Sequence, residues 1–397
     1  MENRRETNRR NAVKVAFESQ LLLKGNKTGI GWCADNLIRG LAKEPDVECQ
    51  MNYFSRGVEP EKLDSLKEYT DLGITLNASS KWKATWYKLV WPFVKIPYHW
   101  FFGDQADITQ FFNYVIPPGV KGKKVTIVHD MAHLACRNTV RKKTRWWLDL
   151  TLKQSCRRAD RILTVSEFSK SEIIKYLNVP EEKVQVMYPG VDLELFHPGY
   201  PAEQVQRAKQ KYGIDGDYIL YLGTIEPRKN LQRLIEAYEK LVTEENVKKL
   251  PQLVLAGGRG WLCDDIYKAA EKVSLRGKVQ FTGYVDEEDI PLLLTGAEFL
   301  AFPSVYEGFG TPPVEALACG TPVLTANVAS MPEVLKEHAV YADPYSTDSI
   351  AEKIRYLHEH AELRERMKQE GPKYVSRYSW NNSVRALKQI YLEMMGK

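Results

Sequence analysis

The feature that most constrains the fold is an alternation of short apolar runs with amphipathic helical stretches along the whole chain. Residues 12–18 (AVKVAFE) are β-branched and alternating, which predicts a first strand, and residues 33–44 have helical spacing. Strands that alternate with helices form parallel sheets whose faces the helices cover. The other strand candidates of the first half are 47–54, 107–115, 124–130, 161–166 and 184–190, with helices at 143–158 and 167–177.

The same alternation starts again after a stretch at 189–201 that contains several prolines and glycines. We therefore predict an N-terminal domain at 1–197 and a C-terminal domain at 198–377, both doubly wound α/β and facing each other across a cleft. In such sheets, ligands bind beyond the carboxyl ends of the strands. The strand candidates of the second half are 218–224, 253–258, 278–285, 299–304 and 322–327, and its first helix is 230–241.

Composition excludes several classes of protein. A length of 397 residues fits two or three domains of roughly 100–200 residues each. The 44% hydrophobic and 27% charged residues are those of a globular chain, not of a disordered or multi-span membrane protein. No apolar run reaches the about 18 residues of a transmembrane helix, and the polar first residues do not resemble a secretion signal. Because the six cysteines lack zinc-site spacing, we expect a cytoplasmic protein with reduced thiols.

Positive charge is concentrated in the first half of the chain. Residues 1–197 hold 31 Lys and Arg against 23 Asp and Glu, whereas the remainder holds 25 against 28, which gives +8 and −3. A basic half suits an anionic partner, such as a membrane surface, a phosphate-bearing substrate or nucleic acid. An exposed basic tail would produce the same imbalance.

Residues 81–102 (KWKATWYKLVWPFVKIPYHWFF) interrupt the α/β pattern. They hold four of the nine tryptophans and four lysines, and they contain no acidic residue. Such segments bind at membrane interfaces, where aromatic rings lie at headgroup level and lysines contact anionic lipid. Because Pro92 and Pro97 spoil a regular helical pattern, an aromatic core insertion or a ligand wall is the alternative.

The window 301–324 predicts an anion site. A strand is followed by the loop Glu307-Gly308-Phe309-Gly310-Thr311 and then by a helix that begins with prolines. Loop glycines let backbone N–H groups approach a ligand, and a helix start favours negative charge. Glu307 and Glu315 frame this site, and carboxylates beside a phosphate suit sugar hydroxyls. For Glu315, simple complementation of the helix dipole is the alternative.

Two cations follow the first strand of the second domain. Arg228 and Lys229, in GTIEPRKNLQRL (223–234), lie between that strand and the next helix. Fixed cations at a strand end suit a diphosphate leaving group without a metal ion. A solvated loop pair is the alternative.

Together these motifs resemble the retaining nucleotide-sugar glycosyltransferases of family 4, which have the GT-B fold of two Rossmann-like domains. The resemblance covers nearly the whole chain, and the bacterial mannosyltransferase-B-like branch is the most similar subgroup. It rests on EPRKN (226–230), EGFGTPPVEALACGTPV (307–323), TGIG (28–31), HD (129–130), TVSEFSKSEI (164–173) and YPGVDLELF (188–196).

The resemblance implies a role for each residue of the second-domain site. Glu307 would contact the donor hexose, and Glu315 would hold the ribose hydroxyls. Arg228 and Lys229 would neutralise the departing diphosphate. The loop residues that would support the sugar and phosphate are Gly308, Phe309, Gly310 and Thr311.

The resemblance also implies contacts outside that loop. His129 would lie near the donor hexose, and Gly29 and Gly31 would let the first loop close on the donor phosphate and acceptor. Gly283 and Tyr284 would contact the base. One departure is Thr224, where several family members have an arginine, so the diphosphate contact is expected to rest on Arg228 and Lys229 alone.

From this family we expect a metal-independent, retaining transfer of a hexose, with GDP-mannose as the donor and no other cofactor. The expected acceptor is a growing cell-surface glycan on a polyprenyl-diphosphate carrier. We expect the enzyme to be cytoplasmic, on the inner face of the membrane, and to bind no nucleic acid. In GT-B relatives the last helix, here within 378–397, packs on the first domain.

Other functions remain open at this stage. The donor could be a UDP-hexose, UDP-GlcNAc or dTDP-rhamnose, because backbone contacts to the base leave little trace in the sequence. A non-hydrolysing nucleotide-sugar epimerase would share the fold but needs acid and base groups around the sugar. A glycan-binding partner subunit would need none of the charged residues named above.

Overall fold

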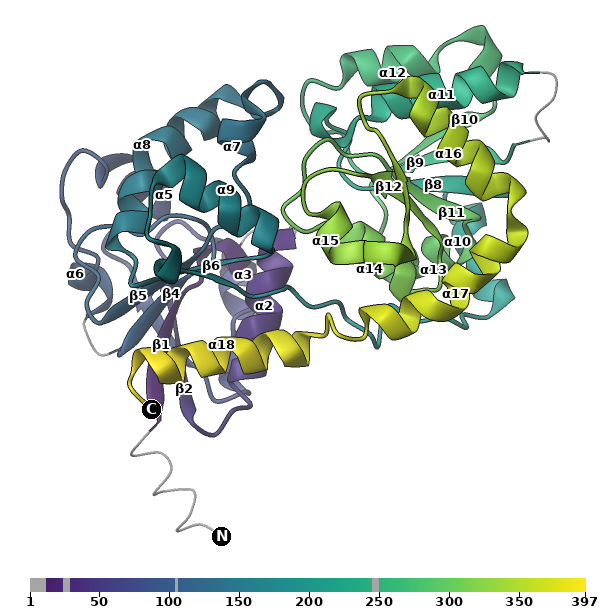
Figure 1. Cartoon of the computed structure of the whole chain (residues 1–397). Coiled ribbons are helices and arrows are strands. Elements are labelled where there is room, and N and C mark those ends of the chain that lie inside the picture. The colour runs from purple at the N-terminus through teal and green to yellow at the C-terminus, as the bar shows by residue number, and fades with distance from the viewer. Residues whose placement is uncertain (1–11, 24–28, 104–105, 245–249) are drawn as a thin grey trace. The chain divides into compact units, whose positions relative to one another are not determined.

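The computed structural model describes residues 12–23, 29–103, 106–244 and 250–397. Its contacts divide the chain into two compact units (Figure 1). Unit 1 comprises 1–131, 142–190 and 380–397, and unit 2 comprises 132–141 and 191–379. The sequence instead predicts a boundary after residue 197 and assigns 132–141 to the first domain.

Unit 1 is built on a parallel seven-stranded sheet with the order β3-β2-β1-β4-β5-β6-β7. The central pairings join Val15 of β1 to Cys49 of β2 and to Ile108 of β4. The strands are β1 Val13–Glu18, β2 Val47–Phe54, β3 Thr75–Ser79, β4 Ile108–Phe111, β5 Lys123–Ile127, β6 Arg161–Thr164 and β7 Val184–Val186.

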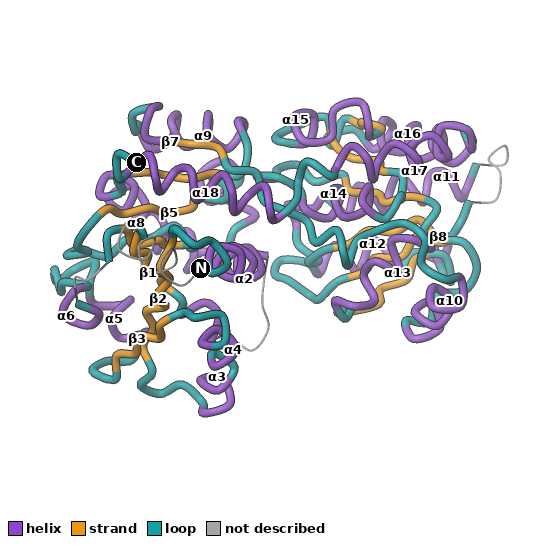
Figure 2. The backbone as a smooth tube through the Cα atoms, turned by 90° about the horizontal axis from the view of Figure 1, so that it is seen from below, coloured by secondary structure: helices purple, strands orange, loops and turns teal. Residues whose placement is uncertain are grey.

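Helices pack on both faces of this sheet (Figure 2). The last helix, α18, packs against α2, and Tyr391 on it donates a hydrogen bond of 2.9 Å to Gln110 on β4. The helices of unit 1 are α2 Gly29–Leu41, α3 Pro60–Asp64, α4 Lys67–Thr70, α5 Ala84–Val90, α6 His99–Phe102, α8 Lys142–Arg158, α9 Glu167–Leu177 and α18 Trp380–Met394, with 3-10 turns η1 Gln20–Leu23 and η3 Glu181–Lys183.

Unit 2 has a parallel six-stranded sheet with the order β10-β9-β8-β11-β12-β13. Its inner strands β8, β11 and β12 are buried at every position, because helices cover both faces. The strands are β8 Tyr218–Leu222, β9 Gln252–Ala256, β10 Val279–Gly283, β11 Phe299–Phe302, β12 Val323–Ala326 and β13 Val340–Ala342.

Amphipathic helices cover the second sheet. In α11 the buried Leu231, Leu234, Ile235, Tyr238 and Leu241 follow the helical period and form one apolar face. The helices of unit 2 are α7 Ala132–Ala135, α10 Ala202–Lys211, α11 Leu231–Thr243, α12 Asp264–Ala270, α13 Ile290–Gly296, α14 Thr311–Ala318, α15 Met331–Leu335, α16 Thr347–Glu359 and α17 Ala361–Val375, with 3-10 turns η2 Arg137–Thr139, η4 Pro227–Lys229, η5 Val273–Leu275, η6 Glu287–Asp289 and η7 Lys336–His338.

The prediction of two doubly wound α/β domains with parallel sheets is confirmed. Each sheet also has a switch point, where the strand order reverses: between β1 and β4 in unit 1, and between β8 and β11 in unit 2. Connections leave the two neighbouring strands in opposite directions at such a point, so their carboxyl ends frame a binding site.

One local prediction is wrong. The sequence predicts that Gly29 and Gly31 belong to the first loop, but α2 already begins at Gly29, so both glycines lie in the first turn of a helix. Residues 25–28 lie outside the described part.

Candidate active site

Four charged side chains meet at the switch point of unit 2. Glu226, Arg228 and Lys229 follow β8, and Glu307 follows β11; we call these four residues the ion cluster. Lys229 donates a hydrogen bond of 2.6 Å to Glu307, and Arg228 donates one of 3.0 Å to the other oxygen of that carboxylate. Arg228 also donates one of 2.7 Å to Glu226. The two loops are therefore joined through charged groups.

Backbone and amide contacts hold the cluster in place. Arg228 donates a further hydrogen bond to the carbonyl oxygen of Tyr306 at 2.8 Å, while its own carbonyl accepts one from the N–H of Val305. Asn230, in the left-handed conformation that ends turn η4, donates to the carbonyls of Pro303 and Pro344. These contacts fix the loop after β8 against the loop after β11.

The ion cluster is largely buried. Glu226 is 2%, Glu307 7% and Lys229 8% exposed. Burial alone would raise the pKa of Glu307, but the positive charges of Arg228 and Lys229 outweigh it and lower that pKa to about 2. Glu307 is thus an anion at neutral pH, and its two oxygens point to two fixed cations.

The loop after Glu307 leads directly into helix α14. Gly310 has φ 86° and is the residue before the helix, and a Cβ atom at this position would lie 2.3 Å from the side chain of Met331. The positive φ favours glycine here, whereas the flexible end of the Met331 side chain could move aside. Ser330 donates a hydrogen bond of 3.0 Å to the carbonyl of Glu307, and Phe309 packs edge-on against Tyr378 at 5.3 Å. Gly308 lies in this loop, and Thr311 is the first residue of α14.

Glu315 lies in the second turn of α14, beyond the first-turn position where the helix dipole would act most strongly. The pKa of Glu315 is raised to about 8, mainly by burial and to a smaller extent by the negative charge of Glu287. Complementation of the helix dipole, the alternative interpretation of Glu315, would act on this pKa in the opposite direction. The carboxyl group is protonated at neutral pH and can both donate and accept hydrogen bonds.

The two residues predicted to contact the base lie at the same edge of the sheet. Gly283 ends the edge strand β10 with φ 74°, and its carbonyl accepts a hydrogen bond of 2.8 Å from the N–H of Gly257. Tyr284 is 65% exposed. The structure does not join this pair to the ion cluster by any contact that we find among the described residues, and β9 lies between β10 and β8.

The remaining predicted residues belong to unit 1. His129 follows β5, and its Nε2 is 2.9 Å from the carbonyl oxygen of Phe112. Burial lowers the pKa of His129 despite that hydrogen bond. Gly29 has no atom within 4 Å of a hypothetical Cβ, and it opens α2 as described above.

Sequence reasoning missed part of the ion cluster. Glu226 stands within the EPRKN motif, yet only the structure shows that it binds Arg228. Its other carboxylate oxygen is buried and has no hydrogen-bond partner among the described residues. The sequence signal for this ion pair is a glutamate two positions before an arginine. The sequence analysis assigned Arg228 and Lys229 to a diphosphate and named no carboxylate partner for them. The fold pairs them with Glu226 and Glu307, because buried charges need compensation.

Residues 81–102 combine both predicted environments. Tyr87, Trp91, Tyr98 and Phe102 are buried, which fits an aromatic core insertion. Five apolar side chains point outward, and we call them the apolar patch. They are Trp86 (62% exposed), Leu89, Phe93 (67% exposed), Val94 and Trp100.

Among the residues that the structure describes, no helix has the length and apolar character that crossing a membrane requires. Nor do three or more His, Cys, Asp or Glu side chains gather as metal ligands there.

Two family models match the chain. Residues 28–195 match the model described as Glycosyltransferase Family 4, and residues 204–374 match the model described as Glycosyl transferases group 1. Together they cover every strand except β1, and every residue of the ion cluster.

Several similar proteins are bacterial mannosyltransferases. The chain is 35% identical to O-antigen chain mannosyltransferase B of Escherichia coli over 271 residues, which cover 68% of this chain and 70% of the relative. It is 30% identical to the serotype-specific mannosyltransferase WbdA of Escherichia coli, covering 67% of this chain but only 33% of that protein.

Solved structures share the architecture. Sucrose-phosphate synthase from Thermosynechococcus elongatus matches with a TM-score of 0.72 at 17% identity, over 97% of this chain and 99% of that one. At this level of identity the match shows the fold, which is GT-B.

Proposed function

We propose a specific reaction for this chain, which belongs to glycosyltransferase family 4 and is a glycosyltransferase. It transfers mannose from GDP-mannose to a growing cell-surface glycan. The similarity to two Escherichia coli mannosyltransferases supports the sugar, and the O-antigen function named for one of them supports the acceptor class. A polyprenyl-diphosphate carrier for that glycan is part of the proposal.

The observation that carries this proposal is the ion cluster at the switch point of unit 2. Arg228 and Lys229 are fixed beside a glycine loop and the start of α14, where a nucleoside diphosphate finds cations and backbone N–H groups together. Glu307 is ionised and suits hydrogen-bond donors such as sugar hydroxyls. The cluster therefore matches both ends of a sugar diphosphate.

The proposed chemistry is a retaining transfer without a metal ion. The bond between the sugar C1 and the diphosphate oxygen breaks, and the acceptor hydroxyl forms a new bond to C1 on the same face. The departing phosphate oxygen takes the hydroxyl proton. Arg228 and Lys229 stabilise the charge that develops on the diphosphate, which in comparable sites contributes about 3–4 kcal/mol per donor group.

Nucleotide binding tests the donor. We expect GDP-mannose to raise the melting temperature most within a panel that includes UDP-glucose, UDP-GlcNAc and dTDP-rhamnose. A ligand at 100 times its dissociation constant adds about 2.7 kcal/mol of stability. A rise in melting temperature with another donor alone would reassign the base or the hexose. If no nucleotide sugar of the panel raised the melting temperature, the enzymatic proposal would be contradicted. The anomeric configuration of the product, determined by NMR, tests retention, since an α-configured donor should give an α-linkage.

The apolar patch supports peripheral binding to an anionic membrane. Its exposed rings are interspersed with Lys81, Lys83, Lys88 and Lys95, the combination that inserts at headgroup level. We expect a Trp86→Ala/Phe93→Ala variant to float with anionic vesicles at least fivefold less than wild type. Tyr345→Ala, which removes a ring of similar exposure in unit 2, serves as the control. Equal flotation of both variants would remove the patch from the proposal.

A further inference from the structure

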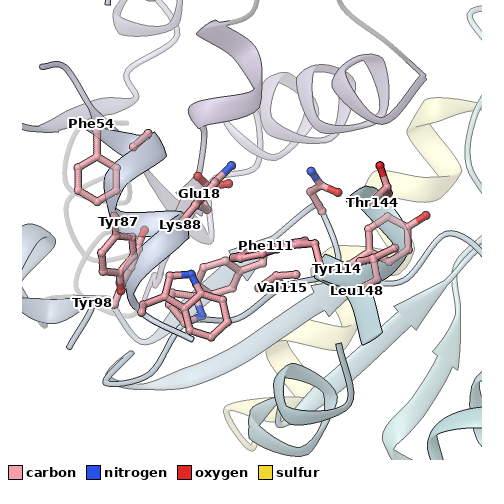
Figure 3. A pocket seen from close by; sticks show the side chains of 15 residues that line it. Glu18, Phe54, Tyr87, Lys88, Tyr98, Phe111, Tyr114, Val115, Thr144 and Leu148 are labelled. Atoms are coloured by element: carbon pink, nitrogen blue, oxygen red, sulfur yellow. The ribbon is translucent and has the colours of Figure 1, made fainter. Parts of the chain in front are cut away.

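Unit 1 has a cavity at its own switch point. The cavity has a volume of about 210 Å³ and is lined by residues from β1, β2, β4, α5, α8 and the loops after α5 and β4 (Figure 3). Glu18 is the last residue of β1 and Phe111 the last of β4, the two strands between which the order reverses. The cavity therefore lies where a sheet of this type binds its ligands.

Seven of the fifteen residues that line the cavity are aromatic. Tyr114 and Leu148 lie on one side, and Phe54, Tyr87 and Tyr98 lie on the opposite side (Figure 3). The rings support each other: the Phe54 and Tyr87 centroids are 5.3 Å apart, those of Tyr98 and Phe111 5.7 Å, and those of Trp91 and Trp147 5.9 Å. Such a wall is held in place before any ligand binds.

The polar groups in the wall define the ligand. They are Glu18, Lys88, Asn113 and Thr144, which together offer both donors and acceptors of hydrogen bonds. A hydrocarbon tail would leave the Glu18 carboxylate against apolar atoms without a partner, which is unfavourable. A phosphate would find one cation and one carboxylate. A pyranose ring fits both features, because its C–H faces pack on aromatic rings while its hydroxyls reach the polar groups.

The size of the cavity limits the ligand further. Pockets for drug-sized ligands measure about 300–1,000 Å³, so a cavity of about 210 Å³ suits a single sugar ring.

Tyr114 connects the cavity to His129. Its φ of 60° is in the left-handed region, which a bulky side chain rarely adopts, so the fold imposes this conformation. The Tyr114 ring meets the His129 ring edge-on, with centroids 5.8 Å apart, and its side chain also lines the cavity. A sugar in the cavity would thus be one ring away from the histidine that the family resemblance assigns to the donor hexose.

We propose that this cavity binds a terminal hexopyranose of the acceptor glycan, with Trp147 as a stacking wall and Glu18 as a hydroxyl acceptor. The inference rests on the proposed function, because only a glycosyltransferase has an acceptor glycan. It adds to that function the chemical class recognised in unit 1 and the residues that recognise it.

Neighbouring tryptophans on α8 provide the test. Trp147 lines the cavity, whereas Trp146 is 56% exposed and does not. In saturation-transfer NMR without any donor, we expect methyl α-mannopyranoside to bind wild type and Trp146→Ala equally. Trp147→Ala should lower its affinity at least tenfold, and Trp147→Phe, which keeps a ring, should restore part of it. In transfer assays, Trp147→Ala should raise the KM for the acceptor by a similar factor, while the dissociation constant of the nucleotide sugar stays within twofold.

The outcomes separate this inference from the proposed function. Equal mannoside binding by Trp147→Ala and Trp146→Ala, or no binding of either methyl mannoside or mannobiose to wild type, would overturn it. Displacement of the mannoside by a short prenyl phosphate that itself saturates the Trp147 site would assign the cavity to lipid instead. Failure of wild type to bind any nucleotide sugar would refute the proposed function but leave the mannoside result standing.

Discussion

The two units use the same topological position for opposite chemistry. In unit 2 the loops at the switch point are joined by the ion cluster, in which two cations and two carboxylates are largely buried. In unit 1 the corresponding loops and the adjacent helices form an aromatic cavity with few polar groups. Parallel strand ends thus provide the place, and the residues that follow them decide the ligand.

This contrast matches the two partners of a glycosyl transfer. A leaving diphosphate gains charge during the reaction and needs fixed cations that are oriented in advance. A neutral acceptor sugar gains no charge of its own before it attacks, so apolar contact and a few hydrogen bonds suffice to hold it. Variants in unit 2 should therefore affect the rate of donor cleavage, and variants in the cavity should affect acceptor affinity.

The largest expected effect follows from removing a cation of the ion cluster. We expect Lys229→Ala to lower kcat about 10²–10³-fold, the loss typical of one group that stabilises transition-state charge. The matched control is Lys240→Ala on α11, an exposed lysine paired with Asp348. Initial rates at saturating donor and acceptor measure the effect. If the Lys229→Ala enzyme were as active as the control, the proposal that unit 2 stabilises the departing diphosphate would be wrong.

A smaller effect is expected for Glu226, which we regard as a positioning residue acting through Arg228. Glu226→Gln keeps the shape but replaces the charged partner of a 2.7 Å hydrogen bond, so Arg228 gains freedom. We expect kcat to fall about tenfold, roughly 1.4 kcal/mol, with little change in the KM for the acceptor. Glu236→Gln, a carboxylate on α11 that bonds Gln232, is the control. A change confined to thermal stability would assign Glu226 a purely structural role.

The pH dependence of stability should distinguish the two glutamates of unit 2. The pKa of Glu315 is raised from 4.5 to about 8, so the unfolded state loses this proton first and stability falls as pH rises between these values. We expect Glu315→Gln to gain more than about 1 kcal/mol relative to wild type between pH 5 and pH 8. Chemical denaturation at both pH values measures this difference.

The contribution of Glu307 to the pH dependence of stability has the opposite sign. Its pKa is lowered from 4.5 to about 2, so its contribution is present above pH 4.5 and is lost as the pH falls toward 2. Glu307→Gln should therefore show no gain between pH 5 and pH 8. Parallel behaviour of the two variants over this range would contradict the charge states assigned to the site.

The smallest expected effect lies in the cavity. Glu18→Gln keeps a hydrogen-bond acceptor but removes the charge, so we expect the KM for the acceptor to rise about threefold, or roughly 0.7 kcal/mol. Donor affinity should not change. A loss of donor affinity instead would show that Glu18 belongs to the donor site and would weaken the contrast between the two units.

Much of the fold could be predicted from local sequence. The buried strands gave clear signals because parallel strands covered on both faces are apolar throughout, and helix α9 was predicted with its observed bounds. The strands that were missed are β3 (TLNAS) and β13 (VYA), which lie at the edges of their sheets. Edge strands are short and partly exposed, so they lack a continuous apolar run.

The sequence by itself determined two parallel α/β domains and the loops that carry Arg228, Lys229 and Glu307, because strand periodicity and short motifs are local properties. Only the tertiary structure decided that Glu226 and Glu307 pair with those cations, that the segment 81–102 is half buried, and that Glu18 and Trp147 line one cavity. The reason is physical: strand order determines which distant loops meet, and burial then determines which charges must be compensated.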